Sequence, residues 1–163
     1  MVNIVIMRHG EAEPLTKQDS QRQLTARGKR EALQMAQWLH NCYSVFSDIW
    51  TSPYIRAGQT AEIMLSKQGP ECQLHTQTAL VPDGLPQLTL DLIDAKLSEQ
   101  PDARILLVSH MPLVSFLVEM LTQQGQTPVF STASLCCIDY QPVTGGRLLE
   151  KMAPQDLALL SHG

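Results

Sequence analysis

The sequence predicts a layered α/β fold, in which strands and helices alternate along one chain. Short apolar runs are separated by segments in which apolar residues have a helical spacing, and this is the pattern of strand–helix alternation. The run Ile105–Val108 is apolar at every position, as expected for a central strand that is covered on both faces. The chain has 163 residues, of which 44% are hydrophobic and 17% charged, and it contains no linker-like segment. Residues 1–163 are therefore expected to form a single domain with its own core.

In the first part of the chain, Val2–Met7 is expected to be a buried strand because it is almost entirely apolar. Glu11–Gln23 is polar and has no clear period, which predicts a loop above the end of that strand. Thr25 is a suitable N-cap for a helix that runs to about His40, in which apolar residues recur at i, i+4 and i+7. Asp48–Thr51 is expected to be a short strand.

A serine–proline pair, Ser52 and Pro53, predicts the start of a second helix, with serine as the N-cap, that ends at about Lys67. The remaining predicted elements are, in chain order, a strand at Cys72–Thr76, a loop at Leu80–Pro86, a helix at Gln87–Glu99, a strand at Arg104–Ser109, a helix from Pro112 to about Leu121, and two strands at Ala133–Tyr140 and Arg147–Met152. The Thr-Gly-Gly segment at 144–146 lies between the last two strands and is typical of a hairpin turn.

Charge and composition exclude several classes of protein. The formal net charge is −4 and there is no basic run, which argues against nucleic-acid binding. No stretch approaches the roughly 18 apolar residues of a membrane span, and the N-terminus lacks the cationic start of a signal peptide. The cysteines, which form no Cys-x-x-Cys pair, are Cys42, Cys72, Cys136 and Cys137. They are expected to be reduced, mostly structural thiols of a cytoplasmic protein, with metal or disulfide use as the alternative.

Cationic and imidazole side chains follow three of the apolar runs. Arg8 and His9 come directly after the first run, Arg56 follows the run that ends at Thr51, and His110 follows the run in the middle of the chain. Ligands bind at the carboxyl edge of the sheet in α/β proteins, so these side chains converge if the strands are neighbours. Arginine matches phosphate oxygens bidentately, and a neutral histidine can attack phosphorus. The pattern predicts metal-independent phosphoryl transfer through a phosphohistidine, although a single arginine is usually a surface residue and a single histidine usually a structural hydrogen bonder.

Four ordered blocks of residues carry a resemblance to a known family. The matching residues are Arg8, His9 and Gly10; Arg22, Leu24, Thr25 and Gly28; Ser52, Pro53, Arg56, Ala57, Gln59 and Thr60; and Val108, Ser109, His110, Pro112, Leu113 and Val114. The arrangement resembles the histidine phosphatase superfamily, which has the phosphoglycerate-mutase-like fold, and within it the small SixA-type phosphohistidine phosphatases. The resemblance runs from the first strand to at least Val114. It implies a three-layer α/β/α sandwich with a mostly parallel central sheet.

The resemblance also implies a role for each of the candidate side chains. His9 is expected to be the catalytic nucleophile, neutral, with its other ring nitrogen held by nearby backbone. Arg8 and Arg56 are expected to bind phosphate and to contribute to catalysis, and Arg22 is either a third phosphate-binding guanidinium or the ion-pair partner of a loop acid. His110 is expected to donate to a phosphoryl oxygen and to stabilise the transition state, with a helix-capping or core histidine as the alternative. The histidines outside the four blocks, expected to be structural or exposed, are His40, His75 and His162.

Two departures from the family pattern bear on the substrate. Sugar-phosphate members of the superfamily carry a serine and an asparagine where this chain has Ala12 and Leu15. They also commonly have a central-loop glutamate that protonates an alkoxide leaving group. Here no glutamate lies between residues 71 and 99, and Asp19 and Asp83 remain as candidate weak acids. Because the P–N bond of a phosphohistidine is labile and imidazole leaves more easily than an alcohol, the missing glutamate favours a phosphohistidine substrate.

The sequence thus predicts a metal-independent protein phosphohistidine phosphatase of the cytoplasm that binds no cofactor. Family members that act on small metabolites often carry long insertions over the pocket, and a chain of 163 residues has little length for them. An open groove suits a phosphorylated protein of a signalling or sugar-transport pathway, such as a histidine phosphotransfer domain or a phosphocarrier protein. The alternatives are a small-molecule phosphomonoesterase or mutase with the same pocket of two histidines and two arginines, and a non-catalytic phospho-binding module.

Overall fold

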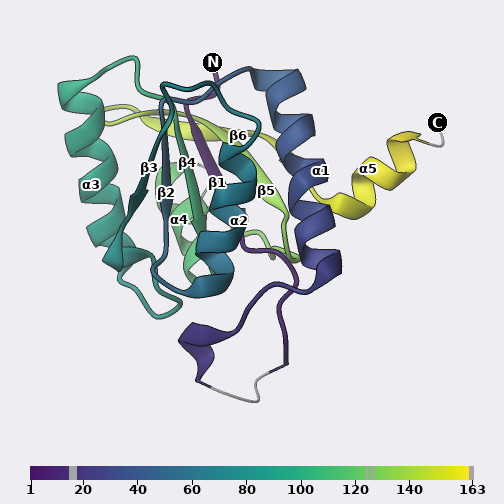
Figure 1. The fold of residues 1–163 in the computed structure, drawn as a ribbon. Helices are drawn as coiled ribbons and strands as arrows, with labels where there is room; N and C mark the ends of the chain where they lie inside the picture. Colours follow the sequence, from purple (N-terminus) through teal and green to yellow (C-terminus); the bar gives the residue numbers. More distant parts are fainter. Residues whose placement is uncertain (15–17, 124, 126, 162–163) are drawn as a thin grey trace.

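A six-stranded sheet forms the centre of the protein, with strand order β3-β2-β4-β1-β5-β6 (Figure 1). The computed structural model describes residues 1–14, 18–123, 125 and 127–161. The strands are β1 (Ile4–Arg8), β2 (Asp48–Thr51), β3 (Gln73–Thr76), β4 (Ile105–Ser109), β5 (Leu135–Gln141) and β6 (Gly145–Met152). The pairs among β1, β2, β3 and β4 are parallel, whereas β5 pairs antiparallel with both β1 and β6. The sheet is therefore mostly parallel, as predicted.

Helices cover both faces of the sheet and complete the three layers (Figure 1). The helices are α1 (Ala26–Tyr43), α2 (Ile55–Leu65), α3 (Pro86–Glu99), α4 (Leu113–Leu121) and α5 (Pro154–Ser161), with two short 3-10 turns, η1 (Asp19–Gln21) and η2 (Thr78–Leu80). Side chains of β1 alternate between the two cores: Ile4 and Ile6 pack with α3 and α4, whereas Val5 and Met7 pack with α1 and α2. Each core cluster holds one pair of helices against one face of the sheet.

The element predictions are largely confirmed, and the structure differs from them in two places that matter. α2 begins at Ile55 with Tyr54 as its N-cap, and no side chain caps it, so the prediction that Ser52 is the N-cap is wrong. The hydroxyl of Ser52 accepts the N–H of Tyr54 and contacts His110, so it is used by the turn that leads into the helix. The sequence prediction also lacked α5, which follows β6 directly.

The register of the parallel strands brings their carboxyl ends to one level. Arg8 is paired with Ser109 across β1 and β4, and Thr51 is paired with Val108 across β2 and β4. The ladder continues past the end of β1, since the N–H of His9 donates to the carbonyl of Ser109 at 3.0 Å. The residues that follow these three strands are therefore neighbours at the carboxyl edge of the sheet.

The loop that follows β1 packs tightly against the start of α1. Thr25 caps α1 as predicted, because its side chain accepts the N–H of Gly28 at 3.0 Å. A Cβ atom on Gly28 would lie 2.1 Å from the carbonyl oxygen of Glu11, and one on Gly10 would lie 2.8 Å from the carbonyl oxygen of Gly28. Both contacts are with backbone, so neither neighbour can rotate away.

Replacing Gly28 with alanine is expected to lower the free energy of unfolding by about 2–3 kcal/mol, because the loop that carries the site must move away from α1. Gly58 in α2 provides the matched control, since a Cβ there meets nothing within 4 Å. Gly58→Ala is expected to be neutral or stabilising by up to ~1 kcal/mol, through the higher helix propensity of alanine. Urea denaturation of both variants measures the difference, and equal stability of the two would contradict the close packing described here.

Candidate active site

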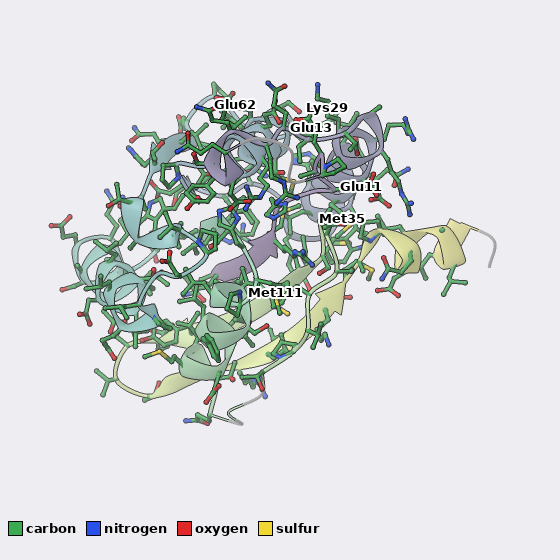
Figure 2. All side chains as sticks on the ribbon, turned by 90° about the horizontal axis from the view of Figure 1, so that it is seen from below. Glu11, Glu13, Lys29, Met35, Glu62 and Met111 are labelled. Atoms are coloured by element: carbon green, nitrogen blue, oxygen red, sulfur yellow. The ribbon has the colours of Figure 1, made fainter. Side chains whose placement is uncertain are left out.

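Three of the four principal candidate residues are in direct contact at the carboxyl edge of the sheet. The ring centroids of His9 and His110 are 5.1 Å apart, and Nε of Arg56 lies 3.2 Å from Nε2 of His9. Arg8, at the end of β1, is near enough for its charge to lower the pKa of both histidines. Figure 2 looks onto this edge, with Glu11 and Glu13 of the loop after β1 on the α1 side and Met111, the neighbour of His110, on the α4 side.

His9 is held as a neutral imidazole with an unprotonated Nε2 that accepts from Arg56. The ring is 6% exposed, and its Nδ1 lies 2.7 Å from the carbonyl oxygen of Gly10. Because a carbonyl can only accept, Nδ1 carries the proton and Nε2 does not. Burial, together with the charges of Arg56 and Arg8, lowers the pKa of His9 to about 4 although the Gly10 carbonyl acts in the opposite direction. The backbone acceptor that the family resemblance implied for this histidine is thus Gly10.

A buried threonine fixes the turn that carries His9 to the helix that carries Arg56. The hydroxyl of Thr60 accepts the N–H of Gly10 at 3.0 Å and donates to the carbonyl of Arg56 at 2.9 Å. Thr60 has no exposed surface, so both bonds are made away from water. The two elements that supply His9 and Arg56 are therefore joined directly below the site.

Arg56 and Arg22 meet at the same acidic residue of the loop. Asp19 accepts from Nη1 of Arg22 at 2.9 Å through Oδ1 and from Nη2 of Arg56 at 3.2 Å through Oδ2. Its backbone carbonyl also accepts from Nη1 of Arg56 at 2.6 Å. Of the two interpretations of Arg22, the ion pair with a loop acid is present. The positive charge of Arg22 also acts on the site, because it contributes to the lowered pKa values of Arg8 and His9.

The two candidate acids differ in position, and neither suits the role. The hydrogen bond from Arg22 is the main reason that the pKa of Asp19 is lowered, so this carboxyl group is ionised near neutral pH. Asp83 is exposed in the loop between η2 and α3, and its carboxylate forms no hydrogen bond or ion pair with any described residue. Leu15, one of the two departures from the sugar-phosphate pattern, lies outside the described residues, as does His162.

His110 is almost completely buried and contacts residues of the first and third blocks. Its Nε2 lies 2.7 Å from Oγ of Ser52, and the ring of Tyr54 packs edge-on against it at 5.0 Å. Its Nδ1 is buried and has no partner among the described residues. Burial, and then the charges of His9 and Arg56, lower the pKa of His110 to about 3. Sequence reasoning missed the contact with Ser52, whose signal in the sequence was its place in the block that also contains Arg56.

Arg8 is held by a backbone group that no sequence pattern marks. Its Nη1 donates to the carbonyl of Phe130 at 2.8 Å, while its Nε is buried without a partner among the described residues. Burial and the charges of Arg56 and Arg22 lower its pKa. A concentration of guanidinium groups with one unmet N–H donor is suited to an anion that bears several oxygens.

Other searches of the described residues bear on the remaining expectations. No group of three or more histidine, cysteine, aspartate or glutamate side chains in the described ranges is arranged to hold a metal ion. None of the described helices is both long and apolar enough to cross a membrane. All four cysteines lie in the described part of the chain and are free thiols.

Comparison with known proteins places the chain in a family. Residues 4–81 match the model of the histidine phosphatase superfamily (branch 1). The chain is 30% identical over 161 residues to the phosphohistidine phosphatase SixA of Escherichia coli (strain K12), which covers 97% of this chain and 98% of the relative. It is 33% identical over 129 residues to a SixA homolog of Haemophilus influenzae, which covers 74% of this chain and 77% of the relative. A solved structure of the protein histidine phosphatase SixA complexed with tungstate superposes with a TM-score of 0.89 and 30% identity, over 94% of this chain and 98% of that one. The chain therefore belongs to the histidine phosphatase superfamily, within the group of the SixA phosphohistidine phosphatases.

Proposed function

We propose that this protein is a metal-independent phosphatase that removes phosphate from a phosphohistidine of a partner protein. The observation that carries the proposal is His9, a buried neutral imidazole with its proton bound on Nδ1 and its Nε2 lone pair next to Arg56. The names of the SixA relatives support the substrate class. His9, Arg8, Arg56 and His110 are assigned the catalytic roles, and the site requires no cofactor.

In the first step, a phosphoryl group binds between the guanidinium groups of Arg8 and Arg56, beside His110. Nε of Arg56 exchanges its contact with His9 for a phosphoryl oxygen, which frees the lone pair of His9 Nε2. This lone pair attacks phosphorus, the P–N bond of the substrate breaks, and its electron pair goes to the leaving imidazole. Gly10 stabilises the charge that develops on the ring of His9, because its carbonyl accepts from Nδ1.

In the second step, a water molecule attacks the phosphorus of phosphorylated His9. The bond between phosphorus and Nε2 breaks, its electron pair returns to the ring, and the protons of the water leave with the released phosphate. His9 is thereby restored as the neutral tautomer that is bound to the carbonyl of Gly10.

Neither Asp19 nor Asp83 is suited to act as a general acid, which is compatible with a phosphohistidine substrate and less so with an alkyl phosphate. Asp19 is ionised and shared by Arg22 and Arg56, and Asp83 is exposed in its loop. A phosphohistidine whose second ring nitrogen already carries a proton leaves as a neutral imidazole, so no enzyme acid has to deliver one. The partner is proposed to be a histidine phosphotransfer domain or a phosphocarrier protein of a cytoplasmic signalling or sugar-transport pathway.

One assay separates this function from the two alternatives. The protein is offered a phosphohistidine protein, phosphoglycerate and an activated aryl phosphate, and phosphate release is followed for each. Turnover of the phosphohistidine protein supports the proposal, preferential turnover of phosphoglycerate supports a small-molecule phosphatase, and binding without release supports a phospho-binding module.

Replacing Arg56 with alanine is expected to cost about 2–4 kcal/mol of transition-state stabilisation, measured as the fall in kcat/KM. This loss is comparable to that of an oxyanion donor. Arg56→Lys is expected to recover little of this loss, because an ammonium cannot contact His9 and both acceptors of Asp19 as the planar guanidinium does. Arg30, which is exposed on α1, supplies the control substitutions to alanine and lysine. Inhibition by tungstate measures binding separately, and near-normal inhibition of both Arg56 variants would remove Arg56 from the phosphate site.

A further inference from the structure

Within the described part of the chain, the side chain of Ser52 makes two hydrogen bonds, and one of them is to His110. Its Oγ accepts the N–H of Tyr54 at 3.1 Å and lies 2.7 Å from Nε2 of His110. Ser52 and His110 are each 1% exposed, so both side chains are shielded from bulk solvent. The two residues follow adjacent strands, β2 and β4, and are 58 positions apart in the chain.

The hydrogen-bond donors and acceptors around Ser52 and His110 determine which of the two atoms, Oγ or Nε2, carries the hydrogen between them. If Nε2 of His110 donated, the hydroxyl hydrogen of Ser52 would lack an acceptor and Nδ1 of His110 would be a buried lone pair without a donor. If the hydroxyl of Ser52 donates to Nε2, only the N–H at Nδ1 is left without a partner. A buried polar group without a partner costs about 1–3 kcal/mol, so the second arrangement is favoured.

We propose that Ser52 is a positioning residue, which holds His110 as the neutral tautomer with its proton on Nδ1 and so makes this N–H the donor to a phosphoryl oxygen. The proposal rests on the function proposed above, since it assigns to the phosphoryl group the one hydrogen bond that His110 lacks. It also specifies that His110 acts as a neutral donor, and not as an imidazolium ion. The unmet donor is then satisfied only when substrate is bound.

The charged groups around His110 act in the same direction as Ser52. Arg8 and His9 from the end of β1 and Arg56 from α2 disfavour a positive charge on the ring, and only Asp19 from η1 favours one. The bond from the Ser52 hydroxyl occupies the Nε2 lone pair that a second proton would need. Loss of this bond is therefore expected to raise the pKa of His110 and to allow the proton to move from Nδ1 to Nε2.

The test is the nitrogen spectrum of the intact protein labelled with ¹⁵N-histidine, which distinguishes a protonated ring nitrogen from an unprotonated one. In the unmodified protein, His110 is expected to show a protonated Nδ1 and an unprotonated Nε2 at neutral pH. Added tungstate is expected to shift the Nδ1 signal, because an oxyanion accepts its proton. Ser52→Ala is expected to give a mixture of tautomers and to lower kcat on a phosphohistidine protein by roughly tenfold to a hundredfold, with a smaller change in KM.

Two further variants separate positioning from mere packing. Ser52→Thr keeps the hydroxyl group and is expected to restore the Nδ1–H tautomer and most of kcat. Ser109→Ala removes a hydroxyl at the same depth, one that donates to the carbonyl of Leu80 at 2.7 Å and not to a ring nitrogen of His110. It is expected to leave the tautomer of His110 unchanged.

Two outcomes would overturn the proposal: a protonated Nε2 on His110 in the unmodified protein, or an unchanged tautomer and kcat in Ser52→Ala. If Ser52→Ala does not fold, the spectrum of the unmodified protein and that of Ser52→Thr still decide the question. The tautomer is read without any substrate, so a failure of the phosphatase assay alone would overturn the proposed function and leave the assignment of Ser52 standing.

Discussion

Replacing His9 with alanine is expected to lower turnover of a phosphohistidine protein by about 10⁴-fold or more, because a water molecule cannot match a positioned nucleophile. The reason lies in the geometry of the ring, whose Nδ1 is fixed by the carbonyl of Gly10 and whose Nε2 already contacts Arg56. Alanine removes the nucleophilic atom that is held in this position. The Arg56 guanidinium remains bound to Asp19, so phosphate binding is expected to be weakened far less than turnover.

The covalent step is measured directly by quenching the reaction of labelled substrate in alkali. The label is expected on His9, stable in alkali and lost in acid, and absent from His9→Ala. His40 supplies the matched control, since it is an exposed histidine in the last turn of α1, and His40→Ala is expected to keep full activity. Substantial turnover by His9→Ala, with circular dichroism like that of the unmodified protein, would exclude the covalent mechanism.

Much of the fold could be predicted because each strand carries its own local pattern. β4 is buried at all five positions, and its first four residues, Ile105–Val108, are all apolar. Such an apolar run predicts a central strand that is covered on both faces. α1 has a good cap and a regular spacing of apolar residues, and both are local signals. α5 was missed because it is short and because Leu159 and Leu160 are exposed, so its apolar residues show no regular helical period in the sequence.

The start of α2 shows why a correct local rule can give a wrong result. Ser52 and Pro53 have the features of an N-cap and a first turn, yet the helix begins at Ile55. The hydroxyl that would have capped the helix instead contacts His110, which follows β4 and is 58 residues away in the chain. No local propensity contains that contact, since it exists only after β2 and β4 have paired.

In the site, the reactive side chains could be predicted from the sequence, whereas the groups that orient them could not. Arg8, His9, Arg56 and His110 could be named because reactive side chains follow apolar runs, and strand order then brings them together. The groups that orient them could not be named. Arg8 is held by the carbonyl of Phe130, which lies 122 residues away and, as a backbone group, has no signal of its own in the sequence.

Selectivity among leaving groups is expected to be the second large effect. Without an acid to protonate the leaving atom, the barrier depends on how well that atom departs unaided. A phosphohistidine protein and activated aryl phosphates are therefore expected to be hydrolysed, and phosphoglycerate far more slowly. A positioned general acid typically contributes 10²–10⁴-fold, and each ~1.4 kcal/mol is tenfold in rate, so the difference in kcat/KM is expected to span at least ~2 decades.

Asp19→Asn and Asp83→Asn test whether either carboxyl group supplies the proton after all. Asp19 is ionised because Arg22 and Arg56 both donate to it, and an ionised group bound by two cations is a poor acid. Asparagine keeps an acceptor for one of these guanidinium groups, so turnover of the phosphohistidine protein is expected to change by less than about tenfold. Asp83→Asn, which alters an exposed carboxylate with no partner among the described residues, is the matched control. The measurement is the steady-state rate of each variant on the phosphohistidine protein and on phosphoglycerate. Saturable, efficient hydrolysis of phosphoglycerate by the unmodified protein that is lost in Asp19→Asn would contradict the prediction. It would mean that Asp19 is protonated during turnover and that the enzyme acts on small alkyl phosphates.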